Sequence, residues 1–352
     1  MPTEDAGAAR ARTYAPILDV IRVLAVIGVV VVHVIADHVP DGPVALTVLR
    51  ALLATAVPAF VMLSGALNLS PVAMRHGSGP FLDRRLRRLL PATIVWTMFY
   101  AGIMQIVIAG QSADPAHVGR ELVLAHSYPH LYFLPLILGL TVITPVLAAY
   151  VSSSGRRAWT VGAVASVWTL LIAALPPLSE ALLERPVTPL QLGTFTYFLP
   201  YIGYYVLGRA AWAAPVPRRT AGLLLSVGLP LLTAATVWAY LSPVTSSGAG
   251  VALLPTYLSP FVMALSLTLV IGVLSCGREW EVSERTESVL RRAGDATFGV
   301  FLLHFVVLVG LRGVGFPEDS ALAVLALVVL VAVGSFALTL LGKQIPGVRA
   351  LL

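Results

Sequence analysis

The chain has little charge, and cysteine and lysine are almost missing from it. Only 11% of its 352 residues are charged, and Cys276 and Lys343 are the single cysteine and lysine. A soluble domain usually carries about 25% charged residues, so too few polar groups are present to cover a soluble protein of this size. One cysteine excludes a disulfide framework within the chain. Residues 1–16 lack the pattern of a cleaved signal peptide, so we expect the first apolar helix to be retained.

Long apolar runs are what the chain has instead. Its residues are 58% hydrophobic and its mean hydropathy is +0.88. A bilayer core of about 30 Å requires roughly 20 apolar residues per helix. The runs predict an all-α polytopic membrane protein, a bundle of about ten transmembrane helices, with tails at 1–16 and 342–352 and a transmembrane domain at 17–341. The expected spans lie near residues 17–36, 44–67, 91–109, 131–150, 159–175, 195–212, 221–241, 255–276, 296–311 and 320–341.

The basic residues predict the orientation of these helices. Alternate connections hold 18 arginines and lysines in one set and four in the other, and Arg22 lies within the first span. Because cytoplasmic loops are enriched in such residues, the alternation predicts an even helix count with both termini cytoplasmic. We therefore expect a multi-pass protein of the cell membrane. In this setting the net charge of +6 indicates topology control and anion binding rather than a nucleic-acid partner.

The first span carries a stripe of polar residues. Ionisable groups inside a membrane are costly and usually functional. At 100° per residue, Arg22 and His33 differ by only about 20°, and Asp19 and Asp37 each lie about 60° from Arg22. All four therefore share one side of the helix, which faces other helices or a wet cavity. His33 lies about 16 Å beyond Arg22 along the axis, towards the external side.

Two interpretations of this stripe remain open. In one, Asp19 and Arg22 cap the cytoplasmic end while His33 bonds a neighbouring carbonyl. In the other, His33 is a general base or an acyl-accepting group, because an imidazole with an ordinary pKa near 6.5 suits proton abstraction from a hydroxyl. Asp37, one turn further on, is either the carboxylate that orients His33 or a solvated loop residue.

Four arginines lie immediately before the third expected span. In a helix, Arg84 with Arg87 and Arg85 with Arg88 would form pairs one turn apart. Guanidinium groups bind phosphate through two parallel hydrogen bonds. The cluster is therefore either a topology signal at lipid headgroups or a docking site for a phosphorylated cytoplasmic cosubstrate such as a coenzyme A thioester.

Other histidines and one serine have two interpretations each. His130 and Tyr132, at the external mouth of the fourth span, either line an acceptor site or belong to an interfacial aromatic belt. His304, inside the ninth span, either binds substrate or makes a hydrogen bond between helices. Ser64 and Gly65 favour close helix packing over catalysis. We expect no metal, because the remaining histidines, His38, His76, His117 and His126, lie in loops at no metal-ligand spacing.

Six stretches between residues 17 and 305 carry a common pattern. They are Leu18–Arg22 followed by His33, Val57–Gly65 (VPAFVMLSG), the Arg84–Arg88 cluster, His130–Leu134 (HLYFL), Phe198–Gly208 and Thr297–His304 (TFGVFLLH). In this order they resemble the membrane-bound acyltransferase 3 family, which includes O-acetyltransferases of bacterial surface polysaccharides. Val61 and Tyr132 depart from the pattern, since the family has an aromatic residue and a tryptophan there.

The resemblance implies an activity and roles for individual residues. It implies transfer of an acyl group, which we expect to be acetyl, from cytoplasmic acyl-CoA to a hydroxyl of an extracytoplasmic or membrane-linked glycan. The catalytic residue would be His33. Arg22 and one arginine pair would bind the donor, and the pair is either Arg84 with Arg87 or Arg85 with Arg88.

Two other functions are compatible with the same residues. A secondary transporter or flippase for a small anion or a lipid-linked sugar would use the stripe as a proton relay. A non-catalytic assembly or sensor subunit would use neither the stripe nor the arginines for chemistry. A cytoplasmic arginine cluster opposite an external histidine suits a two-substrate enzyme better than either.

Overall fold

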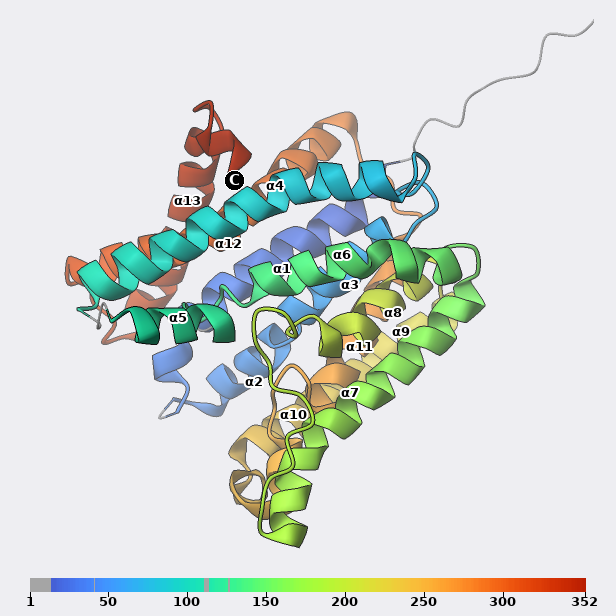
Figure 1. Cartoon of the computed structure of the whole chain (residues 1–352), viewed down its shortest axis with the longest axis horizontal. Helices are drawn as coiled ribbons and strands as arrows, with labels where there is room; N and C mark the ends of the chain where they lie inside the picture. Colours follow the sequence, from blue (N-terminus) through green and yellow to red (C-terminus); the bar gives the residue numbers. More distant parts are fainter. Residues whose placement is uncertain (1–13, 41, 111–113, 126) are drawn as a thin grey trace, which may run out of the picture.

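Helices form most of the chain in the computed structural model, which describes residues 14–40, 42–110, 114–125 and 127–352. No strand occurs in these ranges, and nine helices within them are long and apolar enough to cross a membrane. The predicted all-α polytopic fold is confirmed (Figure 1). The nine are α1 (Pro16–Val34), α2 and α3 together (Val44–Leu53, Ala56–Asn68), α4 with a π-helical extension (Ser78–Phe99, Tyr100–Ile108), α6 (Phe133–Val151), α7 (Gly155–Leu183), α9 to α10 (Arg218–Leu223, Leu224–Gly228, Leu229–Leu241), α11 (Pro260–Gly277), α12 (Glu284–Gly313) and α13 (Ala321–Gly342).

The sixth expected span is shorter than predicted. The helix there is α8 (Ile202–Ala213), which follows a turn of 3-10 helix at Leu199–Tyr201. Twelve residues reach only about 18 Å, whereas the bilayer core is about 30 Å thick. Residues 203–211 are all buried in the protein. The apolar run at 195–212 therefore forms a short helix that contacts protein rather than lipid, and a helix buried on all sides is as apolar as a spanning one.

Glycines let α8 approach α3 until their backbones touch. A Cβ on Gly65 would lie 1.7 Å from the carbonyl oxygen of Tyr205, and a Cβ on Gly208 would lie 1.9 Å from that of Met62. No larger residue fits at either position, which is the small-residue packing typical of membrane helices. The packing role expected for Gly65 is thus confirmed.

Two helices begin earlier than their apolar windows suggested. The prediction placed the third span from about residue 91, but α4 begins at Ser78. Arginine and leucine are good helix formers, and Pro80 in the first turn removes no helical hydrogen bond. The ninth span was expected from about residue 296, but α12 begins at Glu284, where the Ser283 hydroxyl caps the helix. As a result, the arginine cluster lies on the same rigid helix as the span.

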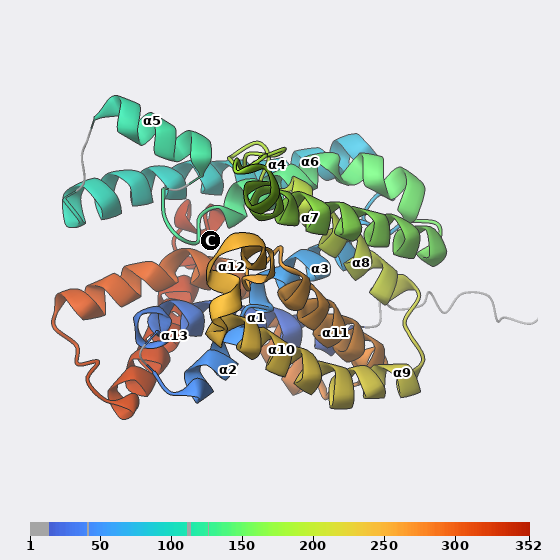
Figure 2. The same cartoon turned by 90° about the horizontal axis from the view of Figure 1, so that it is seen from below.

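Helix α1 lies inside the bundle. It packs against α12, α3 and α13, and α4 packs against α6 (Figures 1 and 2). The chain after α13 returns to α4 (Figure 1), where the Leu351 carbonyl accepts a hydrogen bond from Trp96. A short helix, α5 (Pro115–Leu124), and a 3-10 turn after α1 at Ala36–His38 lie outside the nine. Through the contacts of α1, its residues Asp19, Arg22 and His33 face neighbouring helices and the cavities between them.

Candidate functional site

A salt bridge on α1 fixes Arg22. The Arg22 Nη1 atom lies 2.9 Å from Asp19 Oδ1, and the Tyr14 hydroxyl donates a hydrogen bond of 2.9 Å to Asp19 Oδ2. Gly294 of α12 lies against the same carboxylate, where a Cβ would be 2.5 Å from Asp19 Oδ1. Asp19 therefore has contacts with Tyr14, Arg22 and Gly294, and its carboxylate positions the guanidinium group of Arg22.

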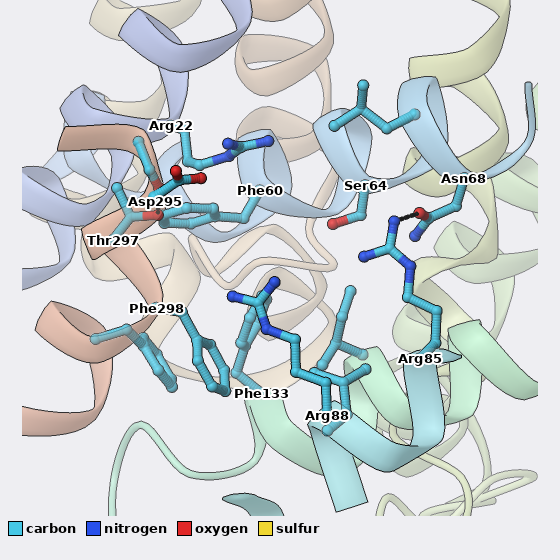
Figure 3. A pocket seen from close by; sticks show the side chains of 15 residues that line it. Arg22, Phe60, Ser64, Asn68, Arg85, Arg88, Phe133, Asp295, Thr297 and Phe298 are labelled. Carbon is cyan, nitrogen blue, oxygen red and sulfur yellow. Dashed lines mark hydrogen bonds between the residues drawn. The ribbon is translucent and has the colours of Figure 1, made fainter. Parts of the chain in front are cut away.

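The Arg22 side chain lines a cavity of about 210 Å³ between α1, α3, α4, α6 and α12 (Figure 3). We call this cavity the arginine pocket. Arg22, Arg85 and Arg88 enter it from two helices, and Asp295 is the one carboxylate in its lining. Three cations against one anion make the pocket a site for a negatively charged group. The other lining residues are Phe60, Ser64, Leu67, Asn68, Leu89, Phe133, Ile137, Gly294, Thr297, Phe298 and Phe301.

The four arginines of α4 have different surroundings. Arg85 Nη2 donates a hydrogen bond of 2.6 Å to Asn68 Oδ1, and the guanidinium carbon of Arg88 lies 6.0 Å from the centre of the Phe298 ring. Arg87 points outward, with 79% of its side chain exposed, and pairs with Asp83 at 2.7 Å. Arg84 lines two neighbouring pockets and not this one. In the arginine pocket the structure thus brings Arg85 and Arg88 together with Arg22. Arg84 shares a neighbouring pocket with Arg22 and Arg85, and Arg87 lines neither of these two.

Three histidines from distant parts of the chain form one cluster. The ring centroids of His33 and His304 are 5.4 Å apart, and those of His130 and His304 are 4.8 Å apart. The ring of Phe305 contacts all three, at 4.6 Å from His33, 4.9 Å from His130 and 4.8 Å from His304. We call these three histidines the imidazole cluster. The sequence suggested each residue separately, and the fold supplies their proximity.

The nitrogens of this cluster are largely unused. His304 Nδ1 lies 2.7 Å from the carbonyl oxygen of Phe301, and since a carbonyl oxygen can only accept, Nδ1 carries the hydrogen and Nε2 the lone pair. That Nε2 atom and both nitrogens of His130 are buried without a hydrogen-bond partner in the described chain. Buried polar atoms are nearly always paired. The cluster therefore has free donors and acceptors for a small polar group, such as a carbonyl or a hydroxyl.

A single aromatic ring separates the pocket from the cluster. Phe301 lines the arginine pocket, and its ring centroid lies 5.1 Å from those of His130 and Phe133. Phe133 also lines the pocket. We call Phe133 and Phe301 the aromatic floor. The arginine pocket and the imidazole cluster are thus neighbours, and Phe301 contacts both.

Asp37 lies outside both compartments. Its side chain is 75% exposed, and its Oδ2 atom lies 3.3 Å from Nη1 of Arg312. Arg312 also bonds both carboxylate oxygens of Glu318, at 2.8 and 2.9 Å. Within the described chain Asp37 makes no hydrogen bond to His33, and these contacts tie the end of α1 to the segment between α12 and α13.

Tyr132 is likewise separate from the histidines. Its ring packs against Tyr197 and Tyr257, with centroids 5.1 and 6.4 Å away. His130, two residues earlier in the turn before α6, packs instead against Tyr100 and Phe305. The two neighbours thus enter different clusters of rings.

The sequence patterns did not indicate several residues that line the arginine pocket. Asn68 follows Ser64 by one helical turn in an apolar run, and this spacing could have marked it. Asp295 comes directly before the stretch Thr297–His304, and Phe301 lies within it. Their roles depend on which helices meet, which one sequence does not state. In the described chain, no group of three or more His, Cys, Asp or Glu side chains is arranged to hold a metal ion, and the expectation of no metal stays a prediction.

Comparison with known proteins gives one match. The family model described as "Acyltransferase domain", that of the acyltransferase 3 family, matches residues 16–340. No curated protein matches the chain, and no solved structure does. The matched range includes every residue of the arginine pocket and of the imidazole cluster.

Proposed function

The chain belongs to the acyltransferase 3 family, and from this premise we propose that it transfers an acetyl group from acetyl-CoA to a hydroxyl of a glycan or glycolipid acceptor. It is a multi-pass membrane acyltransferase; the donor, the acceptor and the cell membrane as its location are our proposal. One observation carries it. Phe301 lines a pocket with three arginines and also touches the histidines, so a phosphorylated donor and the reacting groups have adjacent places.

The arginine pocket is the proposed donor site. Arg85 and Arg88 present guanidinium forks that match phosphate oxygens, and Arg22 adds a third cation held by Asp19. Asn68 orients Arg85 through a hydrogen bond of 2.6 Å. A donor whose phosphates lie here directs its thioester towards the aromatic floor. The basic residues of alternate connections support a cytoplasmic position for this side and for both termini.

The imidazole cluster is the proposed place of acyl transfer. His33 takes the proton of the acceptor hydroxyl, whose oxygen forms a bond to the thioester carbonyl carbon while the carbon–sulfur bond breaks. The proton then passes to the departing thiolate. In a second route a His33 nitrogen attacks the carbonyl carbon and the carbon–sulfur bond breaks, so that His33 carries the acyl group briefly. The acceptor oxygen then takes the acyl group from the imidazole, and the hydroxyl proton passes to the thiolate. In both routes His130 can donate to the carbonyl oxygen as negative charge develops on it.

The remaining predicted residues take supporting roles in this proposal. His304 keeps its Nε2 lone pair free by bonding Phe301 through Nδ1, and it accepts a hydrogen bond from the acceptor. Tyr132, in the ring cluster with Tyr197, forms part of the acceptor's surroundings. Asp37 holds the end of α1 through Arg312 and takes no proton.

Isotope-labelled acetyl-CoA provides the test. The purified protein is incubated with the labelled donor and cell-envelope glycans, and the products are analysed by mass spectrometry. We expect acetylated glycan from the wild type and none from His33→Ala, with the melting temperature unchanged. His117→Ala, on α5 and away from both compartments, is the matched control and keeps full activity. Full activity in His33→Ala would contradict the proposal.

A transport assay tests the alternative. Proteoliposomes that contain the protein are supplied with a lipid-linked sugar, with or without acetyl-CoA. We expect consumption of acetyl-CoA and modification of the sugar. Flux of unmodified sugar without consumption of acetyl-CoA would show a transporter or flippase instead.

A further inference from the structure

A second basic pocket, of about 720 Å³, adjoins the arginine pocket. We call it the C-terminal pocket, because Lys343 and Arg349 after α13 contribute to it. Arg88 and Asp295 line both pockets, so the two pockets have one guanidinium group in common. The complete lining is Arg84, Arg87, Arg88, Asp295, Lys343, Arg349, Ala350 and Leu352.

Specific contacts hold this pocket in shape. The indole Nε1 of Trp96 on α4 donates a hydrogen bond of 3.1 Å to the Leu351 carbonyl. The Leu352 side chain is 4% exposed and packs so close to Gly342 that a Cβ there would lie 2.6 Å from it. A 3-10 turn at Val348–Ala350, just before these two residues, carries Arg349. The segment is thus fastened to α4 through Leu351 and to the end of α13 through Leu352.

The pocket has more positive charge than its own carboxylate can balance. Five cations line it against Asp295, and Arg87 has its own partner, Asp83. Arg84, Arg88 and Arg349 make no ion pair within the described chain. Lys343 donates to the backbone carbonyl of Asp295 rather than to a carboxylate. Burial, the largest cause, and the charge of Arg88 lower the pKa of Lys343, although the Asp295 carboxylate raises it. Like charges held together in this way are stabilised by a multivalent anion.

We propose that the C-terminal pocket binds a phosphate monoester, the 3′-phosphate at the nucleotide end of the donor. The inference rests on the proposed function, since it concerns the same donor. Coenzyme A carries a pyrophosphate and, on its ribose, a separate monoester. Two adjoining basic pockets that share Arg88 match these two separate groups. Arg349 and Lys343 are then specificity residues that distinguish coenzyme A from a donor without the monoester.

A binding measurement tests this without catalysis. The full chain in nanodiscs of zwitterionic lipid is titrated calorimetrically with adenosine 3′,5′-bisphosphate and with adenosine 5′-monophosphate. We expect the wild type to bind the bisphosphate about tenfold or more tightly, because a charge-assisted hydrogen bond contributes that much. Arg349→Ala should remove this difference and Arg349→Lys should retain part of it. Arg219→Ala removes an exposed arginine that lines neither pocket and should change nothing.

Two results of this titration would overturn the proposal. One is unchanged discrimination in Arg349→Ala. The other is loss of discrimination in Arg75→Ala but not in Arg349→Ala. Arg75 lines a different basic pocket, together with Arg22, Arg84, Arg85 and Arg291, and this pocket also adjoins the arginine pocket. That outcome would place the nucleotide end there.

A lipid headgroup offers the same phosphate chemistry, and native mass spectrometry distinguishes the two sources. Wild type and Arg349→Ala are released from nanodiscs that contain phosphatidic acid. We expect equal retention of this lipid by both. Retention by the wild type alone, together with bisphosphate affinities that do not depend on Arg349, would assign the pocket to lipid and overturn the proposal.

A kinetic measurement separates this proposal from the function on which it rests. For the wild type we expect KM for acetyl-3′-dephospho-CoA to exceed that for acetyl-CoA about tenfold, with kcat similar. In Arg349→Ala the two KM values should converge. If neither donor reacts but Arg349-dependent bisphosphate binding persists, acyl transfer is refuted and the pocket stands. If both donors react with the same KM in the wild type, the pocket assignment is refuted and acyl transfer stands.

Discussion

His130 meets His304 edge to face, with ring centroids 4.8 Å apart and ring planes inclined by 71°. His33 reaches the same His304 ring from α1, at 5.4 Å. His130 and His304 are buried, and three of their nitrogens have no hydrogen-bond partner in the described chain, at a cost of about 1–3 kcal/mol for each unsatisfied group. A protein that needed only a packed core would have apolar residues at these positions. The unpaired imidazole nitrogens therefore indicate a reactive site, where activity is retained at the expense of stability.

Replacement of His130 by phenylalanine should separate stability from activity. The variant removes two buried nitrogens without partners and keeps an aromatic ring against Phe305, so we expect an unchanged or higher melting temperature. Acyl transfer should fall about 10²-fold or more, because the donor to the developing oxyanion is lost. Thermal unfolding in detergent and acyl-CoA turnover are measured on the same preparations. A purely structural His130 would give the reverse, a less stable enzyme with normal turnover.

The arginine pair that binds the donor can be identified by lysine substitutions. Arg85→Lys loses the hydrogen bond to Asn68 and the planar fork, so we expect KM for acyl-CoA to rise about tenfold. Arg87→Lys retains an exposed pairing with Asp83 that contributes at most about 0.5 kcal/mol, so its KM should stay within twofold of the wild type. The check is a comparison of the two KM values at one ionic strength. The opposite ranking would assign the donor to Arg84 and Arg87.

The aromatic floor should limit the length of the acyl group. Phe301→Leu removes part of the wall between the pocket and the histidines, so we expect kcat/KM for butyryl-CoA to rise relative to that for acetyl-CoA. The measurement is the ratio of the two values in each variant. Phe336→Leu makes the same change on α13, outside the pocket, and should leave the ratio unaltered. An unaltered ratio in Phe301→Leu as well would exclude this role for the floor.

The contact between α3 and α8 should be intolerant of a single methyl group. In Gly65→Ala the new Cβ would lie 1.7 Å from the Tyr205 carbonyl oxygen, so the helices must separate and we expect the folded yield or the melting temperature to drop sharply. Gly222→Ala, on α9, meets nothing within 4 Å and should stabilise the protein by roughly 0.5–1 kcal/mol. Size-exclusion profiles and melting temperatures compare the two. Similar behaviour of both variants would contradict the packing described here.

The sequence alone was sufficient for the fold class, because apolar length and the count of charges decide whether lipid covers a chain. It overestimated the length of the sixth span, at α8, because an apolar run does not show whether protein or lipid surrounds a helix. It also failed at the start of α4, where arginines continue the helix that the hydropathy window ended. Helix propensity, rather than hydropathy, contained that information.

For the candidate site, the sequence indicated Arg22 and His33 through helical periodicity and the family pattern. It could not select Arg85 and Arg88 over Arg84 and Arg87, because that choice depends on how α4 is rotated towards α1. The cluster of His33, His130 and His304 depends on contacts between residues up to 271 positions apart. Such contacts are properties of the packed helices.

The aromatic floor also bears on the transmembrane potential, because it limits proton leakage through the protein. A continuous column of water from Arg22 to His33 would be a path for protons, and each charge that crosses 100 mV exchanges about 2.3 kcal/mol with the field. Phe133 and Phe301 interrupt that column with apolar carbon. An acetyl group is neutral, so its passage past the two rings does no electrical work. In the proposed reaction, the protein can thus modify one face of the membrane from the other without discharging it.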